Sequence, residues 1–552
     1  MNKFKITIAC LIAAIFLLLP QTAQAAEDFS DMPKDHWAYS QVMKLRDLNI
    51  TSGIGDNNFG TGRTITRAEF ATMLENLMQM SANRPSYNSY SEHMQSYDAL
   101  TRFFKTSGSA EAFPYPEYNP IDNITREEMA VMLVCRLGLD YLAEKDFAKN
   151  SAFTDVRQNA GYIGIAKDLG IVSGTSATTF GPSDTATREQ AAAMMVRVYN
   201  ILQNKADELN GFYAIRSSNQ MMAINSLDTV SFGWCAVETD GADVWLNTTS
   251  SNENEYNIPA GFEQPWNMAA GKNRLIMVAV KDEISAKIIN NPALSQKAAS
   301  AIASILSSGL GGKDIYADGI VLDFETLKGA ESCANYTSFV KNIRSLVGNK
   351  LIYVAVHPER YNHEYYDGYD FRTLGQLADK IILMAHDYNP KALTEQDMAA
   401  GIVMTPVAPL DWVYESLRAI TDENTGVSDK DKIMLQISFS SCQWKLQDGK
   451  VINSKPYTPD YSAILNRIQP GAEVNYSWPN HRSPYLKFYN EEDNTDNVIW
   501  YEDERSVRDK MQMALLFGIK DFSFWRIGTI PDFKQENLNI NASFNVYDVI
   551  FK

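Results

Sequence analysis

The sequence has few cysteines and none of the spacings that metal sites or disulfide-stapled folds use. Only 5 of its 552 residues are cysteine, and no two of them form a C-x-x-C pair. This absence argues against a zinc ribbon and against a disulfide-stapled mini-domain. An exported protein could pair two thiols, but isolated buried thiols are the simpler interpretation for the four that follow the N-terminal segment: Cys135, Cys235, Cys333 and Cys442.

Positive charge is also scarce. The chain has 50 Lys and Arg against 67 Asp and Glu, which gives a formal net charge of −17. A protein this acidic repels phosphate backbones, so nucleic acid is not an expected partner. The hydrophobic share of 45% is that of a globular protein. At this length, the chain is expected to form about two to four domains.

Long apolar runs are confined to the N-terminus. Lys3 and Lys5 precede an apolar run over residues 6–19, and an A-x-A motif that ends at Ala25 follows it. This order of features predicts a secretory signal peptide over residues 1–25. No other segment has the roughly 18 uninterrupted apolar residues of a membrane span, so none is expected in the mature chain.

The N-terminal third contains an internal repeat. A Phe-x-Asp motif begins at Phe29 and again at Phe153, and Thr-Arg pairs begin at Thr66, Thr125 and Thr187, spaced 59 and 62 residues apart. Each of these threonines has Glu or Gln three residues later, as in a capping box, and an apolar helical pattern follows. The sequence therefore predicts a three-repeat helical module whose repeats cover about 29–80, 96–140 and 153–202.

The arginine of each pair lies in the first helical turn, where a cation opposes the helix dipole. Its recurrence favours an anionic partner for Arg67, Arg126 and Arg188, although buried arginines paired with acidic neighbours are an alternative. The segments resemble S-layer homology repeats over about residues 26–202. The resemblance implies an anchor to anionic secondary cell-wall polysaccharide, contacted by these arginines. The middle repeat departs from the pattern because it lacks a clear Phe-x-Asp opening.

The remainder, residues 203–552, alternates short β-rich runs with helical stretches, which predicts βα units and a parallel sheet. Eight runs are enough for a (β/α)8 TIM barrel: 212–215, 229–237, 274–280, 317–324, 351–356, 380–384, 432–439 and 522–525. A doubly wound sheet is the alternative, but the Gly cluster at 309–312 precedes a strand instead of following one. The polar, aromatic stretch over about 443–502 predicts a small subdomain inserted after the seventh strand.

The strand over residues 318–325, Asp-Gly-Ile-Val-Leu-Asp-Phe-Glu, carries the clearest chemical signal. Because side chains alternate along a strand, Val321, Asp323 and Glu325 share one face, which we assign to the barrel interior. Two neighbouring carboxyl groups at the C-terminal end of a buried strand raise at least one pKa, as a general acid near neutral pH requires. A salt-bridged pair on an exposed strand end is the alternative.

This octapeptide resembles the signature of family 18 glycoside hydrolases. The segment from Met384 to Asp387 resembles the family's Met-x-Tyr-Asp motif, and Trp525 resembles the tryptophan beneath the bound sugar. The resemblance spans about residues 211–535. It implies a retaining, substrate-assisted mechanism on a β-linked N-acetylglucosamine glycan, either peptidoglycan or chitin, with no metal or organic cofactor.

The resemblance also implies roles for individual residues. Glu325 is expected to be the general acid and then the base, and Asp323 to bind and stabilise the substrate's acetamido group. His386 and Asp387 complete the catalytic set. The substrate-binding residues are expected to be Asp318, Tyr388 and Trp525.

Two positions depart from the family. Val321 stands where the family has an acidic or amide residue, and His386 replaces the tyrosine, so its charge depends on pH. A metal site like that of a barrel amidohydrolase is another possible interpretation of His357, Glu359, His386, Asp387 and Asp323, but the absence of His-x-His on the first strand disfavours it. A non-catalytic glycan-binding or structural S-layer protein is the other alternative. Secretion to the bacterial cell wall or S-layer surface is expected.

Overall fold

The computed structural model describes residues 28–80, 121–149, 153–359, 367–468, 472–477, 481–533 and 544–552. The expected signal peptide and much of the expected middle repeat lie outside these residues, so both stay predictions. The chain divides into two compact units. The first comprises Met1–Met80, Tyr115–Arg126 and Ser183–Arg197, and the second comprises Ser81–Pro114, Glu127–Pro182 and Val198–Lys552.

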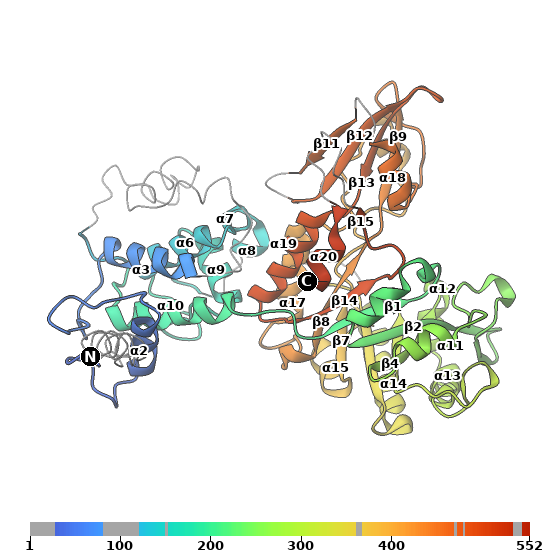
Figure 1. Ribbon diagram of the computed structural model, residues 1–552, viewed down its shortest axis with the longest axis horizontal. Helices are drawn as coiled ribbons and strands as arrows, with labels where there is room; N and C mark the ends of the chain where they lie inside the picture. Colours follow the sequence, from blue (N-terminus) through green and yellow to red (C-terminus); the bar gives the residue numbers. More distant parts are fainter. Residues whose placement is uncertain are drawn as a thin grey trace, which may run out of the picture. The chain divides into compact units, whose positions relative to one another are not determined.

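The first unit contains α2 (Tyr39–Asp47), α3 (Arg67–Met80) and most of α10 (Arg188–Leu202) (Figure 1). Two of the expected capping boxes are confirmed. The Glu69 N–H donates to the Thr66 hydroxyl at 3.3 Å, and the Thr66 N–H donates to the Glu69 carboxylate at 3.0 Å. Thr187 and Gln190 form the same reciprocal pair, at 3.4 and 3.1 Å. These local bonds satisfy backbone groups at the starts of α3 and α10.

Short antiparallel bridges join the segments before the Thr-Arg helices: Thr64 with Thr187, Thr66 with Asn123, and Thr125 with Thr185. In the Phe-x-Asp motif, the carboxylate of Asp31 accepts hydrogen bonds from three consecutive backbone N–H groups, those of residues 59–61, at 2.6–2.8 Å. The motif thus fixes the loop that precedes the Thr-Arg helix.

The described part of the second unit begins with four helices: α6 (Arg126–Arg136), α7 (Asp140–Ala143), α8 (Asp146–Lys149) and α9 (Ala160–Asp168). Asp155 of the second Phe-x-Asp motif accepts from the N–H groups of Phe180 and Gly181, both at 2.8 Å. The same motif therefore has the same structural role in both repeats.

A closed eight-stranded parallel barrel follows in the second unit, which confirms the expected fold. Its strands are β1 (Leu209–Tyr213), β2 (Thr229–Thr239), β4 (Asn273–Val280), β5 (Gly319–Phe324), β6 (Leu351–Val356), β7 (Lys380–Leu383), β8 (Ile433–Ser438) and β14 (Asp521–Trp525). β1 pairs in parallel with both β2 and β14, which closes the barrel. β3 (Val244–Asn247) adds an antiparallel pairing to β2. Every one of the eight expected runs forms a strand.

Helices connect these strands: α11 (Glu263–Met268), α12 (Asp282–Ile289), α13 (Pro292–Ile305), α14 (Gly329–Val347), α15 (Phe371–Leu377), α16 (Glu395–Ala399), α17 (Leu410–Ile420) and α19 (Glu504–Leu516). A further helix, α20 (Val546–Phe551), follows the last barrel strand. The barrel interior is packed with side chains from alternate strand positions, among them Leu275, Met277, Val321, Tyr353 and Met434. The barrel is therefore a filled core, and a ligand can enter only at its ends.

The expected insertion after the seventh barrel strand is confirmed. A five-stranded antiparallel sheet with the order β10-β9-β13-β12-β11 follows β8. Its elements are β9 (Cys442–Gln447), β10 (Lys450–Val451), α18 (Tyr461–Arg467), β11 (Glu473–Tyr476), β12 (Pro484–Asn490) and β13 (Thr495–Trp500). Trp444 and Trp500, both fully buried, form its apolar core with Cys442 and Val498.

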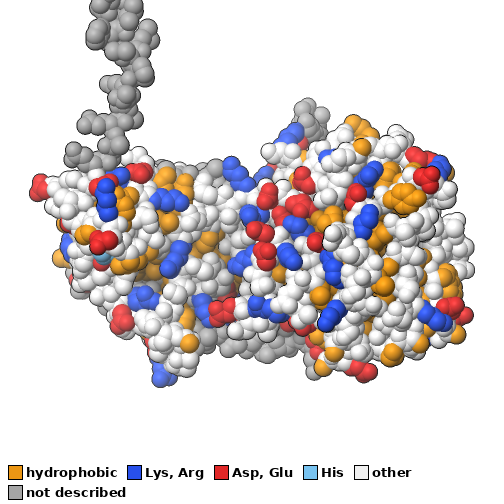
Figure 2. All heavy atoms as spheres, turned by 90° about the horizontal axis from the view of Figure 1, so that it is seen from below, with side chains coloured by type: hydrophobic (Ala, Val, Ile, Leu, Met, Phe, Trp, Pro, Cys, Tyr) orange, Lys and Arg blue, Asp and Glu red, His pale blue; other side chains and the backbone are white. Residues whose placement is uncertain are grey.

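Figure 2 shows the molecule from below relative to Figure 1. On the face it shows, acidic and basic side chains are interspersed, and hydrophobic side chains are scattered among them. Scattered exposed hydrophobic residues are usual for a globular protein. Within the described residues, none of the helices combines the length and the apolar character that crossing a membrane requires.

Candidate functional site

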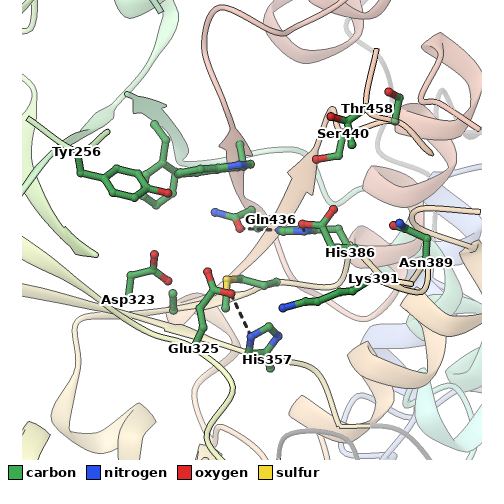
Figure 3. Close-up of a pocket in the computed structure, with 16 residues that line it drawn as sticks. Tyr256, Asp323, Glu325, His357, His386, Asn389, Lys391, Gln436, Ser440 and Thr458 are labelled. Carbon is green, nitrogen blue, oxygen red and sulfur yellow. Dashed lines mark hydrogen bonds and ion pairs between the residues drawn. The ribbon is translucent and has the colours of Figure 1, made fainter. Parts of the chain in front are cut away.

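A cavity of about 350 Å³ opens at the C-terminal ends of the barrel strands, where the active sites of TIM barrels lie. Figure 3 shows the side chains that enter it from several different strands. They include Asp323 and Glu325 from the end of β5, His357 after β6, His386 after β7, and Trp525 at the end of β14. The structure therefore brings together the two carboxyl groups, the histidine and the tryptophan that the sequence singled out.

Asp323 lies at the buried base of this cavity, with 8% of its surface exposed. Burial, followed by the charges of Glu325 and Asp282, raises the pKa of Asp323 well above its usual value. Its Oδ1 atom has no hydrogen-bond partner among the described residues. The fully buried Val321, two residues earlier on the same face, packs in the barrel core and offers no polar atom. These surroundings therefore favour the protonated form of Asp323 relative to a carboxyl group in water.

Glu325 follows the last residue of β5 and reaches the more open part of the cavity, where 35% of its side chain is exposed. Its Oε2 atom lies 3.3 Å from Nε2 of His357. Because β5 and β6 are neighbouring parallel strands, the residues after their C-terminal ends meet at the same edge. The sequence identified His357 only as part of a metal alternative, and its pairing with Glu325 follows from this strand order.

His386 is held from both sides. Its Nδ1 lies 2.9 Å from Oδ2 of Asp387, and its Nε2 lies 2.7 Å from Oε1 of Gln436 on β8. Burial lowers the pKa of His386, but the charge of Asp387 and the hydrogen bonds to Asp387 and Gln436 outweigh it, so the pKa is raised above 6.5. In the protonated ring, both nitrogens donate to these two oxygens. Both ring nitrogens are thus already bonded within the protein.

Sequence reasoning missed Gln436, although a signal for it was present. In the β8 sequence Ile-Met-Leu-Gln-Ile-Ser, Gln436 is a polar residue that shares a face with Met434, which packs in the barrel core. A buried glutamine needs hydrogen-bond partners, and this one finds His386 and the hydroxyl of Ser523 at 3.4 Å.

Three aromatic side chains, those of Phe212, Tyr256 and Trp525, line the cavity. The ring of Trp525 packs against that of Phe212, with a centroid distance of 5.2 Å and an interplanar angle of 65°. Tyr256, which the sequence reasoning missed, also lines the cavity, and Figure 3 shows it on the same side as Asp323. Burial, and then the charges of Asp323 and Glu325, raise its pKa. An aromatic wall beside carboxyl groups suits a sugar ring.

Two residues that were expected to bind substrate do not line this cavity. Asp318 precedes β5 at its opposite end, about 20 Å from Glu325 at the usual rise per strand residue. There it accepts a hydrogen bond from the N–H of Arg274 at 3.0 Å. Tyr388 is buried, and its hydroxyl lies 2.6 Å from that of Ser416. The described residues also contain no group of three His, Cys, Asp or Glu side chains placed to hold a metal ion.

The three arginines of the repeats differ in burial. Arg67 is 8% exposed and pairs with Asp122 at 3.2 Å. Arg188 is 3% exposed, donates from Nε to the backbone oxygen of Phe59 at 2.8 Å, and lies 3.3 Å from Glu69. Arg126 is only partly buried. Pairing with acidic neighbours, the alternative considered for these arginines, is thus present at Arg67 and Arg188.

Comparison with known families gives two matches. The model of glycosyl hydrolases family 18 matches residues 218–529, which is more than half of the chain. The model of the S-layer homology domain matches residues 28–71 and 152–192. The central Thr-Arg helix, α6, lies outside both S-layer homology matches.

Individual relatives resemble one part of the chain or the other. The cortical fragment-lytic enzyme of Bacillus subtilis (strain 168) is 22% identical over 50% of this chain and 59% of its own length. The chain thus spans less than two thirds of that relative. The surface layer protein of Brevibacillus choshinensis is 30% identical over 25% of this chain and 13% of its own. A crystal structure of chitinase from Chromobacterium violaceum ATCC 12472 aligns with a TM-score of 0.48 and 17% identity, covering 62% of this chain and 98% of that one.

Proposed function

The chain belongs to the glycosyl hydrolases of family 18, and from this premise we propose that it is a secreted, wall-anchored glycosidase that cleaves a β-linked N-acetylglucosamine glycan. The observation that carries the proposal is the pair of carboxyl groups at the end of β5. One is buried with a raised pKa and the other is half-exposed, and both lie in a cavity with an aromatic wall. Environments that differ in this way give two carboxyl groups different roles.

In the proposed reaction, Glu325 donates its proton to the glycosidic oxygen, and the acetamido oxygen of the substrate attacks the anomeric carbon. The bond to the leaving sugar breaks and an oxazolinium ion forms, so the sugar itself supplies the nucleophile. Glu325 then removes a proton from the water that opens this ion. The anomeric configuration is retained because two displacements occur.

Asp323 would act on the acetamido group during these steps. Its carboxyl group has an oxygen that can accept the acetamido N–H, and its buried Oδ1 has no partner among the described residues to compete for this role. As positive charge develops on the oxazolinium ring, ionisation of Asp323 becomes favourable because the opposite charge lies beside it. Trp525 would stack against the same sugar.

The experiment is to measure release of reducing ends from peptidoglycan and from chitin by the full chain and its Glu325→Gln variant. Glutamine keeps the shape of the side chain but has no acidic proton. Loss of general acid catalysis should lower kcat by about 10²–10⁴-fold. Asp318→Asn is the matched control, because Asp318 lies at the far end of the same strand.

Unchanged turnover in Glu325→Gln would contradict the catalytic assignment. Loss of activity in Asp318→Asn would support the original expectation that Asp318 binds substrate. Glycan binding without turnover in the parent would favour a non-catalytic glycan-binding protein instead.

The location we propose is the bacterial cell wall or S-layer surface, on the strength of the S-layer homology matches at residues 28–71 and 152–192. Arg67, Arg126 and Arg188 are the proposed contacts to anionic wall polysaccharide. An anchor of this kind would hold the barrel beside peptidoglycan, which we therefore favour over chitin as the substrate.

A further inference from the structure

Lys391 occupies a distinctive place in the cavity. Of the sixteen described residues that line the cavity, it is the one lysine or arginine. It follows β7, and its Nζ lies 2.7 Å from Oδ2 of Asp282, the first residue of α12 after β4. Because β5 and β6 lie between β4 and β7 in the sheet, this pair spans the cavity mouth beyond the end of β5. Figure 3 shows the ammonium end of Lys391 directed toward Glu325 and His357.

The charges around this lysine are mostly negative. Glu325 and Asp387 line the same cavity, and Asp282 pairs with Lys391 at its mouth. The two cavity histidines already pair with Glu325 and Asp387. An anionic group on a substrate would be repelled by these carboxyl groups everywhere except beside Lys391. An ammonium group can also donate to the hydroxyls of a neutral sugar, but only a negatively charged substituent adds charge pairing to these hydrogen bonds.

The ion pair with Asp282 leaves Lys391 able to bind such a group. The side chain of Lys391 is 78% exposed and that of Asp282 is 41% exposed, and exposed pairs of this kind contribute little stability. An ammonium group has three donors, so it can hold Asp282 and a second carboxylate together or exchange one for the other.

The position of the Lys391 ammonium group relative to Glu325 indicates which of the two sugars at the cleaved bond it contacts. Under the proposed function, on which this step rests, Glu325 protonates the oxygen that links the two sugars at the cleaved bond. The sugar attacked by its own acetamido group lies over Asp323 and Trp525. The ammonium beside Glu325 therefore faces substituents of the leaving sugar.

We propose that Lys391 binds a carboxylate carried by the leaving sugar, so that the enzyme cleaves between N-acetylglucosamine and an acidic sugar. The carboxylate has two possible sources: a carboxyl group linked to the sugar ring through an ether, or one on a peptide attached to that sugar. Both occur in peptidoglycan and neither occurs in chitin.

The test compares kcat/KM of the full chain on three substrates: neutral chitooligosaccharides, peptidoglycan strands stripped of peptides, and intact peptidoglycan. Lys391→Met should reduce the selectivity for acidic over neutral substrate by about tenfold, equivalent to about 1.4 kcal/mol, and mainly through KM. Lys391→Arg, which keeps the charge, should retain most of this selectivity. Lys297→Met is the matched control, because Lys297 forms an exposed pair with Asp243 at 3.3 Å and does not line the cavity.

The outcomes separate this proposal from the one it rests on. Loss of selectivity on stripped strands supports the ring-linked carboxyl group, and loss on intact peptidoglycan alone supports the peptide carboxylate. Equal reduction of kcat/KM on acidic and neutral substrates by Lys391→Met would overturn the role of Lys391 while leaving the glycosidase proposal intact. Absence of turnover by the parent on all three substrates would overturn the proposed function itself.

Discussion

Changing Gln436 to Met should lower the pKa of His386. Gln436 accepts a hydrogen bond from Nε2 at 2.7 Å, and Met fills a similar volume without a strong acceptor. A hydrogen bond to a charged group contributes about 1.5–3 kcal/mol, whereas one to a neutral group contributes about 0.5–1.5 kcal/mol. The difference, about 1–1.5 kcal/mol, stabilises the protonated ring and corresponds to about one pKa unit.

The pH dependence of the stability change follows from the direction in which the pKa of His386 is shifted. The pKa of His386 in the folded protein lies above 6.5, its ordinary value. The stabilisation that protonation gives the fold is therefore complete below about pH 6.5, and it is lost as the pH rises through the folded-state pKa. Gln436→Met should consequently destabilise the protein more at pH 6 than at pH 9.

The chain has 6 histidines, so NMR of selectively labelled histidine rings can follow each titration, with His386 identified by its replacement. Gln443→Met is the matched control, because Gln443 is buried in the inserted sheet and bonds to Asn497 and Arg467, with no histidine involved. Asp387→Asn should lower the pKa further, since it removes a charge. A His386 pKa at or below 6.5 in the parent, or one unchanged by Gln436→Met, would refute the reasoning.

Two other predictions concern anchoring and stability. The full chain should sediment with purified cell walls and stop doing so once the wall polysaccharide is stripped. Replacing Arg67, Arg126 and Arg188 together by Ala should also abolish sedimentation with the walls. Because Arg67 and Arg188 are buried, their loss could also unfold the module, so Arg126→Ala alone is the second variant, and it should weaken binding in a folded protein. Undiminished sedimentation with stripped walls would count against the anchor. Lys510→Met should lower the melting temperature by about 3–5 °C, because it leaves the buried Glu502 carboxylate, now 2.7 Å from Lys510, without its cationic partner at a cost of about 3–5 kcal/mol, against an unfolding entropy of about 1 kcal/mol/K for a unit of this size. A change below about 1 °C would contradict this.

The strands and the helix starts could be predicted from the sequence because their signals are local. Alternation of side chains placed Asp323 and Glu325 on one face of β5, and the structure has both in the cavity. The capping boxes at Thr66 and Thr187 form between residues three positions apart, so neither needs a distant partner. The insertion after the seventh strand also follows from the order of segments along the chain.

The partners of the site residues were decided by the closure of the barrel. Gln436 lies 50 residues from His386, and Asp282 lies 109 residues from Lys391. Each pair meets because parallel strands bring their C-terminal ends to one edge, where distance along the chain no longer determines distance in space. Strand direction also put Asp318 at the opposite end from Glu325, although both belong to one short motif. The sequence by itself determined that Asp323 and Glu325 share one face at the end of a barrel strand, and the tertiary structure decided which charges and hydrogen bonds each one meets, because those depend on strand order and burial.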